Sequence, residues 1–240
     1  MTILQLTRIL RSYLVVSLPA TDVTGITITS IQGNTVTVSG STGTTDAWSG
    51  GLLRITNGNF DLMTSAIISN TGTTLIISTP FDPVTAAALI GAECEIQGGP
   101  LRDANVFHIQ PKSIKDLVTS GENVFIYINP LDTAISRRAL GGNDKALHAA
   151  RNQSRAFNMQ IIASVPMSTG AITTETAYIN QTKVYDLNEQ ICARLLLFTS
   201  LNRYPISSEI DMDTNFGLLE PDGGKKSEIA IINFGFALSL

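Results

Sequence analysis

The stretch from Ile26 to Val38 reads Ile-Thr-Ile-Thr-Ser-Ile-Gln-Gly-Asn-Thr-Val-Thr-Val and contains two runs in which apolar and polar residues alternate. Such alternation is typical of a half-buried β-strand, because successive side chains of a strand point to opposite faces. The two runs are separated by Gln32-Gly33-Asn34, a sequence that favours a tight turn. This stretch therefore predicts short strands joined by turns.

The residues around this stretch, from 19 to 100, repeat the same pattern. They are dense in Thr, Ser, Gly and β-branched residues, and turn sequences such as Asn57-Gly58-Asn59 and Asn70-Thr71-Gly72 divide them. Further short strands are predicted at residues 52–55, 75–77 and 93–96, and one helical turn at 86–89. Short strands at close spacing predict a small all-β barrel or sandwich over residues 19–100.

The flanking segments have a different periodicity. Apolar residues recur at helical spacing from Ile3 to Leu14, and again in a second predicted helix over residues 182–200. Buried strands are predicted at residues 124–128, 157–165 and 229–238, with a further candidate strand at 205–210. Residues 211–220 lack the regular oxygen ligands of a calcium loop, so we interpret them as a solvated hairpin.

The first helix cannot be a domain by itself, because an isolated helix of this length is marginal in water. It must pack on the later sheet, which makes residues 19–100 an insertion into a host domain of residues 1–18 and 101–240. The predicted fold class is α+β. It comprises an antiparallel sheet with two packed helices and a long hairpin arm, plus the inserted small all-β barrel or sandwich.

The composition narrows the classes of function. The 240 residues carry a formal charge of −4, and charged residues are only 15% of the chain, against roughly 25% in an average soluble domain. A surface so poor in charge suits a subunit that buries it against copies of itself. No apolar run approaches the length of a membrane span. Arg8 and Arg11 interrupt the N-terminal apolar stretch, which argues against an export signal.

Residue types that carry chemistry are few and scattered. His108 lies in an apolar sequence and His148 in a polar one, and neither has a cysteine or carboxylate at metal-ligand spacing beside it. The two cysteines, Cys94 and Cys192, are too few for a zinc cluster, and we interpret them as buried free thiols. Glycine pairs lack the following Lys-Ser/Thr of a phosphate loop, and no Gly-x-Ser-x-Gly is present. We therefore expect no enzyme, no metal and no cofactor.

The single tryptophan, Trp48, allows two interpretations. A stacking platform for sugars or bases would need companion aromatic residues, and this segment offers only Phe60 and Phe81. We therefore favour a core anchor of the small β-domain.

The segment from Thr133 to Arg155 joins two predicted strands and is long for a connection inside a compact domain. Five of the 16 basic residues of the chain lie in it: Arg137, Arg138, Lys145, Arg151 and Arg155. It is either a solvated hairpin tip or an arm that docks on a neighbouring subunit or acidic partner, since arginine pairs well with carboxylates. Neither interpretation needs catalysis.

This order of elements resembles the tail-terminator and neck proteins of tailed bacteriophages. The resemblance is carried by the helix at residues 3–14, the strand and arm at 124–165, the helix at 182–200 and the closing strand at 229–238. In addition, the sequences that begin at Asp46, Ile68 and Thr79 look like the β-barrel repeats of phage tail and adaptor proteins. The insertion near residue 20 is a departure from the minimal terminator.

The resemblance implies a structural virion protein, assembled in the host cytoplasm and located at the tail or neck. Such proteins form a ring, commonly a hexamer, that caps the tail tube and joins it to the head-side connector or stopper. DNA would pass the lumen without sequence-specific binding, and no membrane would be involved. Alternatives are another tail component (an adaptor, tube-like or baseplate subunit) or a carbohydrate-binding β-module.

Overall fold

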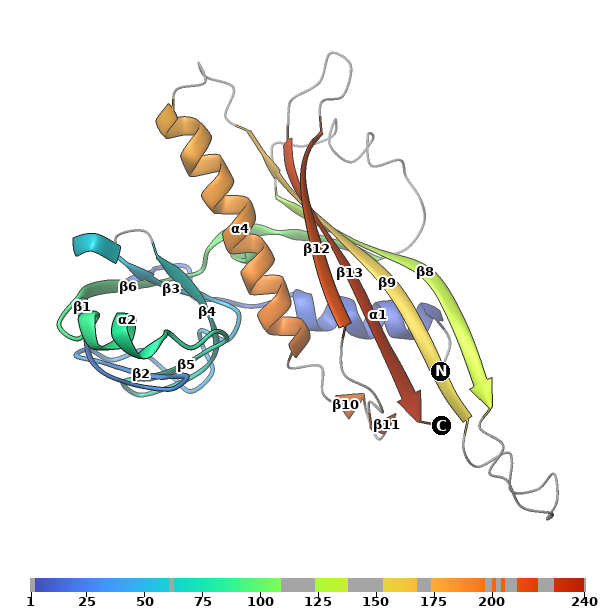
Figure 1. Ribbon diagram of the computed structural model, residues 1–240, viewed down its shortest axis with the longest axis horizontal. Helices are drawn as coiled ribbons and strands as arrows, with labels where there is room; N and C mark the ends of the chain where they lie inside the picture. The colour runs from blue at the N-terminus through green and yellow to red at the C-terminus, as the bar shows by residue number, and fades with distance from the viewer. Residues whose placement is uncertain are drawn as a thin grey trace. The chain divides into compact units, whose positions relative to one another are not determined.

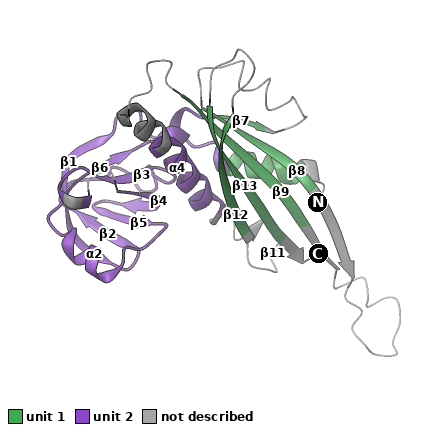
Figure 2. Cartoon of the chain, turned by 45° about the horizontal axis from the view of Figure 1, so that its top comes forward, with its two compact units in different colours: residues 1–13, 105–169, 198–240 green, residues 14–104, 170–197 purple. Residues whose placement is uncertain are grey.

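The computed structural model divides the chain into two compact units, each of which is described by itself (Figure 2). One unit comprises Met1–Tyr13, Asn105–Thr169 and Phe198–Leu240, and the other Leu14–Ala104 and Gly170–Leu197. The structure describes residues 3–60, 63–108, 124–137, 153–167, 174–196, 200–201, 204–205, 211–219 and 227–239.

The second unit contains a closed antiparallel barrel (Figure 1). Its strands are β1 (Val23–Gln32), β2 (Thr35–Val38), β3 (Leu52–Ile55), β4 (Thr64–Thr71), β5 (Thr74–Ile77) and β6 (Glu93–Gln97), in the order β1-β2-β5-β4-β3-β6. The short helix α2 (Pro83–Ala88) precedes β6. The all-β prediction for this segment is confirmed, and closure decides for a barrel over a sandwich. Strand β4 was not predicted as a separate strand.

Turn chemistry sets the register of the barrel's first hairpin. Gln32 pairs with Thr35, which leaves Gly33 and Asn34 as a two-residue turn. Gly33 has a φ of +59°, a conformation that a residue without a Cβ adopts without strain. The apolar residues of both strands then face the barrel interior, where Ile28, Val36 and Val38 are buried.

The barrel core includes Trp48, which is 2% exposed, so the interpretation as a core anchor is confirmed. Its backbone N–H donates to the Oδ1 of Asn70 on β4 at 2.8 Å. The buried Asn70 amide in turn donates to the carbonyls of Thr42 and Thr44. One asparagine thus ties the loop that carries the tryptophan to the barrel wall.

The first unit contains a five-stranded sheet in the order β12-β13-β9-β8-β7. Its strands are β7 (Asn105–His108), β8 (Phe125–Arg137), β9 (Gln153–Pro166), β12 (Asp211–Leu219) and β13 (Ser227–Ser239). Three predicted strands are present as β8, β9 and β13, and each is longer than predicted. A separate two-stranded sheet pairs β10 (Ser200–Leu201) with β11 (Tyr204–Pro205). The rest of the candidate strand at 205–210 lies outside the described residues.

Two predictions for this sheet are wrong. The sheet is mixed rather than antiparallel, because β7 pairs with β8 in parallel. Residues 211–219 form the nine-residue strand β12 instead of a solvated hairpin. In this strand Asp213 and Asn215 are exposed while Met212 and Thr214 are half-buried. Weak alternation of that kind is typical of a strand with little apolar surface to bury, which is why the sequence did not reveal it.

Helix α1 (Ile3–Leu14) has the predicted bounds and lies across one face of the five-stranded sheet (Figure 1). Leu6, Leu10 and Leu14 repeat every four residues and are fully buried. The Nε of Arg11 donates to the carbonyl of Val106 on β7 at 3.0 Å. All of the helix except Leu14 belongs to the first unit.

Helix α4 (Thr174–Leu196) begins and ends earlier than predicted and falls within the barrel unit rather than the expected host domain. The fully buried side chain of Gln190 accounts for this placement. Its Nε2 donates to the carbonyls of Gly50 and Gly98 at 2.6 and 2.8 Å, and its Oε1 accepts from the N–H of Leu101 at 3.0 Å. One helical position thereby satisfies two carbonyls next to barrel strands and one N–H of the 3-10 helix η2 (Pro100–Asp103).

Candidate interaction surface

The β8–β9 hairpin forms the base of the predicted arm. The strands pair in register out to Arg137 and Gln153, with Ile135 opposite Arg155. Arg137 and Arg155 therefore lie on paired strands near the end of the hairpin, although their side chains are not described. The other three predicted arm residues, Arg138, Lys145 and Arg151, lie outside the described residues.

One face of the five-stranded sheet is apolar and buried. Every second residue of β8, β9 and β13 points to it, and α1 lies against it. Its buried members include Ile126, Ile128, Met159, Ile161, Ala163, Ala230, Ile232, Phe234 and Phe236. The rings of Phe157 and Phe236 stack there with their centroids 5.5 Å apart. This face forms the apolar core of the sheet.

The opposite face of the sheet is apolar at one end of the strands and polar further along. Where β8 pairs with β7, this face carries buried residues of β8 and β9, such as Phe125, Tyr127 and Ile162. One row further on, four polar residues stand opposite one another across four strands: Asn129, Gln160, Asn233 and Asp213. The Gln160 Nε2 donates to the Asn233 Oδ1 at 3.4 Å. Nearby, the Asn215 Nδ2 donates to the Asp213 Oδ2 at 3.3 Å. We call the region from this row to Gly235 the polar face.

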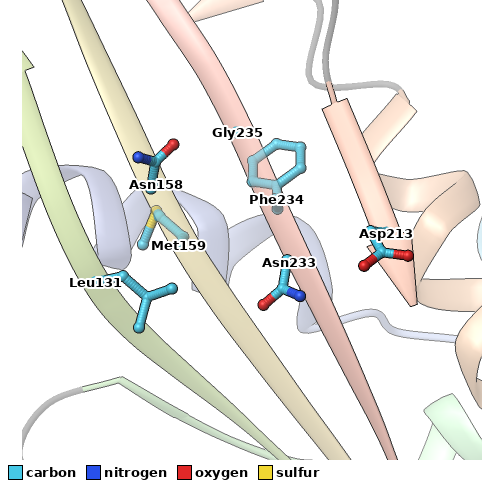
Figure 3. Close-up of a pocket in the computed structure, with 7 residues that line it drawn as sticks. All are labelled: Leu131, Asn158, Met159, Asp213, Asn233, Phe234 and Gly235. Carbon is cyan, nitrogen blue, oxygen red and sulfur yellow. The ribbon is translucent and has the colours of Figure 1, made fainter. Parts of the chain in front are cut away.

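The polar face is hollowed where Gly235 replaces a side chain with a hydrogen atom. Gly235 lies opposite Asn158 on β9 and Asp211 on β12. The resulting shallow hollow has a volume of about 420 Å³. Figure 3 shows the residues that line it: Leu131, Asn158, Met159, Asp213, Asn233, Phe234 and Gly235. Asp213 is the one ionisable residue among them and is exposed.

A β-bulge shapes the hollow on the β8 side. The register shifts between Pro130 and Asp132, so Leu131 is the extra residue. Proline cannot donate to the sheet, and bulges are one of the places where a strand tolerates it. Leu131 is 53% exposed and adds an apolar element beside the amides. The lining combines amide groups and one carboxylate with a larger apolar area.

Two ionisable groups with shifted pKa values lie on α4, outside this surface. Burial raises the pKa of Asp186, although a 2.7 Å hydrogen bond from the Thr64 hydroxyl and the nearby Arg54 oppose the shift. Burial and the charge of Asp186 together raise the pKa of Glu189. These residues belong to the packing of α4 on the barrel.

The remaining sequence candidates are dispersed. Cys94 is buried in the barrel core, as predicted, and burial raises its pKa to about 11. Cys192 is only half-buried, so the prediction of two buried thiols is wrong for it. His108 lies at the end of β7, and His148 lies outside the described residues. Asp213 of the rejected calcium loop lies on β12 and lines the hollow.

The described part of the chain shows neither a metal-binding cluster nor a membrane-spanning helix. No group of three or more His, Cys, Asp and Glu residues is placed there to hold a metal ion. None of its helices combines the length and the apolar character needed to cross a membrane.

Sequence reasoning missed the polar face, although its signal is present. The β9 sequence Phe157-Asn158-Met159-Gln160-Ile161 and the β13 sequence Ile232-Asn233-Phe234-Gly235 both alternate strictly. The alternation predicts one apolar and one amide-bearing face, but only the pairing register brings the amides of the two strands side by side.

No protein-family profile matches the chain, and no curated protein is significantly similar to it in sequence.

Proposed function

We propose that this chain is a structural virion protein that forms a ring at the head–tail junction of a tailed bacteriophage, where it caps the tail tube and joins it to the connector. The support is architectural. The chain has an N-terminal helix against a sheet, a long hairpin within that sheet, a closing strand and an additional small β-barrel.

The observation that carries the proposal is the length of the β8–β9 hairpin. Its strands have 13 and 14 residues, against a mean strand length of about 5–6 in globular proteins. On β8, burial of both faces ends after Ile128, and Leu131 is largely exposed. β7 pairs with β8 only as far as Ile128, so from Asn129 to Arg137 the outer edge of β8 pairs with no other described strand and offers surface to another subunit.

The two outer strands of the sheet also expose large apolar side chains. Phe216 and Leu218 on β12 are 45% and 51% exposed, and Phe107 on β7 is 44% exposed. Ring assembly is heterologous, so each subunit needs two different contact surfaces. The outer strands β7 and β12 lie at opposite sides of the sheet and differ in sequence, which suits such contacts.

The low charge suits passage of DNA through the ring. A formal charge of −4 with only 16 basic residues gives phosphates little to bind. The polar face presents mainly neutral amides. In this proposal the ring interacts weakly with the DNA that passes it, and the ring's specificity is for protein partners.

Electron microscopy and mass photometry of the purified full chain test the proposal. We expect closed rings, and a hexamer of the 25.7 kDa chain has a mass of about 154 kDa. Antibody labelling of virions should place the chain at the neck. Labelling at the baseplate or along the tube would favour another tail component, and absence of the chain from virions would overturn the proposal.

A variant with a shortened hairpin tests whether the arm is needed to join tails to heads. Because Arg137 pairs with Gln153, residues 138–152 can be replaced by the two-residue turn Asn-Gly. We expect a folded protein that no longer joins tails to heads. The matched control replaces the barrel turn Gly72-Thr73, between Thr71 and Thr74, by Asn-Gly and should leave joining intact. Normal particle yield with the arm variant would exclude a role for the arm.

A further inference from the structure

We propose that the hollow of the polar face receives the basic segment 138–152 of a neighbouring copy of this chain. The inference rests on the proposed ring, and it names the surface on which the arm docks. Every residue of the hollow is described by the structure, whereas the occupant is identified by its sequence.

The chemistry of the hollow selects a basic partner. Asp213 offers a carboxylate, and the amides of Asn158 and Asn233 offer further acceptor oxygens. No lysine or arginine is among the lining residues to neutralise Asp213. The exposed side chain of Leu131 suits the aliphatic stem of a lysine or arginine, whose charged head reaches beyond it.

The dimensions select an extended peptide rather than one side chain. The hollow spans four adjacent strands, from Leu131 on β8 to Asp213 on β12 (Figure 3). Three interstrand spacings amount to about 14 Å. That span corresponds to about four residues of extended chain, so an extended peptide can cross the hollow and place one basic side chain near Asp213.

The segment 138–152 has the complementary charge. It contains Arg138, Lys145 and Arg151 against one acidic residue, Asp144, which gives a net charge of +2 with His148 neutral. Charge pairs of this kind across an interface fix its register and increase the association rate.

The pairing of the hairpin favours a neighbouring copy over the segment's own chain. β8 and β9 remain paired for six residues beyond Leu131, out to Arg137 and Gln153. Six extended residues place the end of the paired strands about 20 Å from the hollow and directed away from it. To enter its own hollow, the segment would have to reverse and run back along the sheet over this distance, whereas the hollow of a neighbouring copy in the proposed ring does not require that reversal.

A charge-swap experiment with the full chain tests the inference. Variant one is Asp213→Lys, and variant two combines Arg138→Glu, Lys145→Glu and Arg151→Glu. When either variant is alone, every contact between an arm and a hollow brings like charges together. In an equimolar mixture, the two variants can alternate around the ring. The glutamate-bearing arm of one variant then meets the lysine at position 213 of the other, and in the next contact a native arm meets a native Asp213. Glu93→Lys, an exposed charge change of the same size on the barrel, is the matched control.

The readout is the assembled fraction by mass photometry, with circular dichroism to establish that each variant folds. We expect each variant alone to lose at least tenfold in assembly, the mixture to recover most of it, and the control to assemble like the wild type. Asp213→Asn should give an intermediate loss. If the wild type forms rings and both variants assemble as well as the wild type, the docking surface is wrong and the ring proposal stands. Losses that mixing does not restore would overturn docking between copies, and a wild-type chain that never assembles would overturn both proposals.

Discussion

The Thr64 hydroxyl on β4 donates a 2.7 Å hydrogen bond to the Oδ1 of Asp186 on α4. The two residues are 122 positions apart in the sequence, and Asp186 is only 6% exposed. A carboxylate is therefore part of the contact between helix and barrel. Burial is the largest influence on Asp186, and it raises the pKa above the ordinary value.

The burial of Asp186 and Glu189 predicts that mild acid stabilises the barrel unit. The pKa values of Asp186 and Glu189 are raised in the folded state, so between the unfolded and the folded pKa the folded state binds more protons. The free energy of unfolding then rises as the pH falls through the folded pKa values. Each tenfold change in an acid dissociation constant on folding contributes about 1.4 kcal/mol. Urea denaturation at pH 7 and pH 5 measures the effect.

The matched variant for that prediction is Asp186→Asn, which keeps the acceptor for Thr64 and removes the titration. Its stability should rise less than that of the wild type between pH 7 and pH 5. An equal rise in both proteins would show that Asp186 titrates normally.

Gln190 is predicted to be a main determinant of α4 packing. Gln190→Leu makes the side chain apolar at similar size but leaves the carbonyls of Gly50 and Gly98 and the N–H of Leu101 unpaired. Buried unpaired groups are costly, so we expect a loss of about 2–4 kcal/mol in the free energy of unfolding. Lys183→Leu, at an exposed position of the same helix, should change it by less than about 0.5 kcal/mol.

Asn70 is predicted to position Trp48. Asn70→Ala removes the acceptor for the Trp48 N–H and the donors to Thr42 and Thr44, and it leaves a small cavity. We expect a loss of about 2–3 kcal/mol, measured by denaturation. Because Trp48 is the single tryptophan, its fluorescence reports the barrel, and its emission should shift to the red in the variant. Asn215→Ala, at an exposed position, should leave both quantities unchanged. Unchanged emission in the Asn70 variant would show that the loop does not need this amide.

The two cysteines are predicted to differ in reactivity. Burial raises the pKa of Cys94 to about 11, so at pH 8 about one thiol in a thousand is ionised, and the thiolate is the reactive form. Cys192 is half-buried on α4. In native protein an aromatic disulfide reagent should therefore modify Cys192 first, and urea should release the second thiol. The variant Cys192→Ser should show almost no native reaction, and fast reaction of that variant would contradict the burial of Cys94.

The sequence predicted those elements whose hydrophobic period is strong over their own length. Helix α1 is one, since three leucines at four-residue spacing suffice to mark its buried face. The barrel strands are others, because alternating runs and turns such as Gly33-Asn34 fix them locally. Prediction from the sequence failed for β7 and β12. β7 has only four residues and pairs in parallel with a distant segment, and the polar residues of β12 show no strong alternation.

By itself, then, the sequence determined the local structure: the class of the barrel segment, the first helix, the buried strands and the basic character of residues 137–155. Only the tertiary structure decided that α4 packs on the barrel, because the three backbone groups bound by Gln190 are 89 to 140 residues away from it. Register likewise decided that Asn129, Gln160, Asn233 and Asp213 share one row. Contacts between residues far apart in the chain depend on how strands pair, and no local period of the sequence encodes that choice.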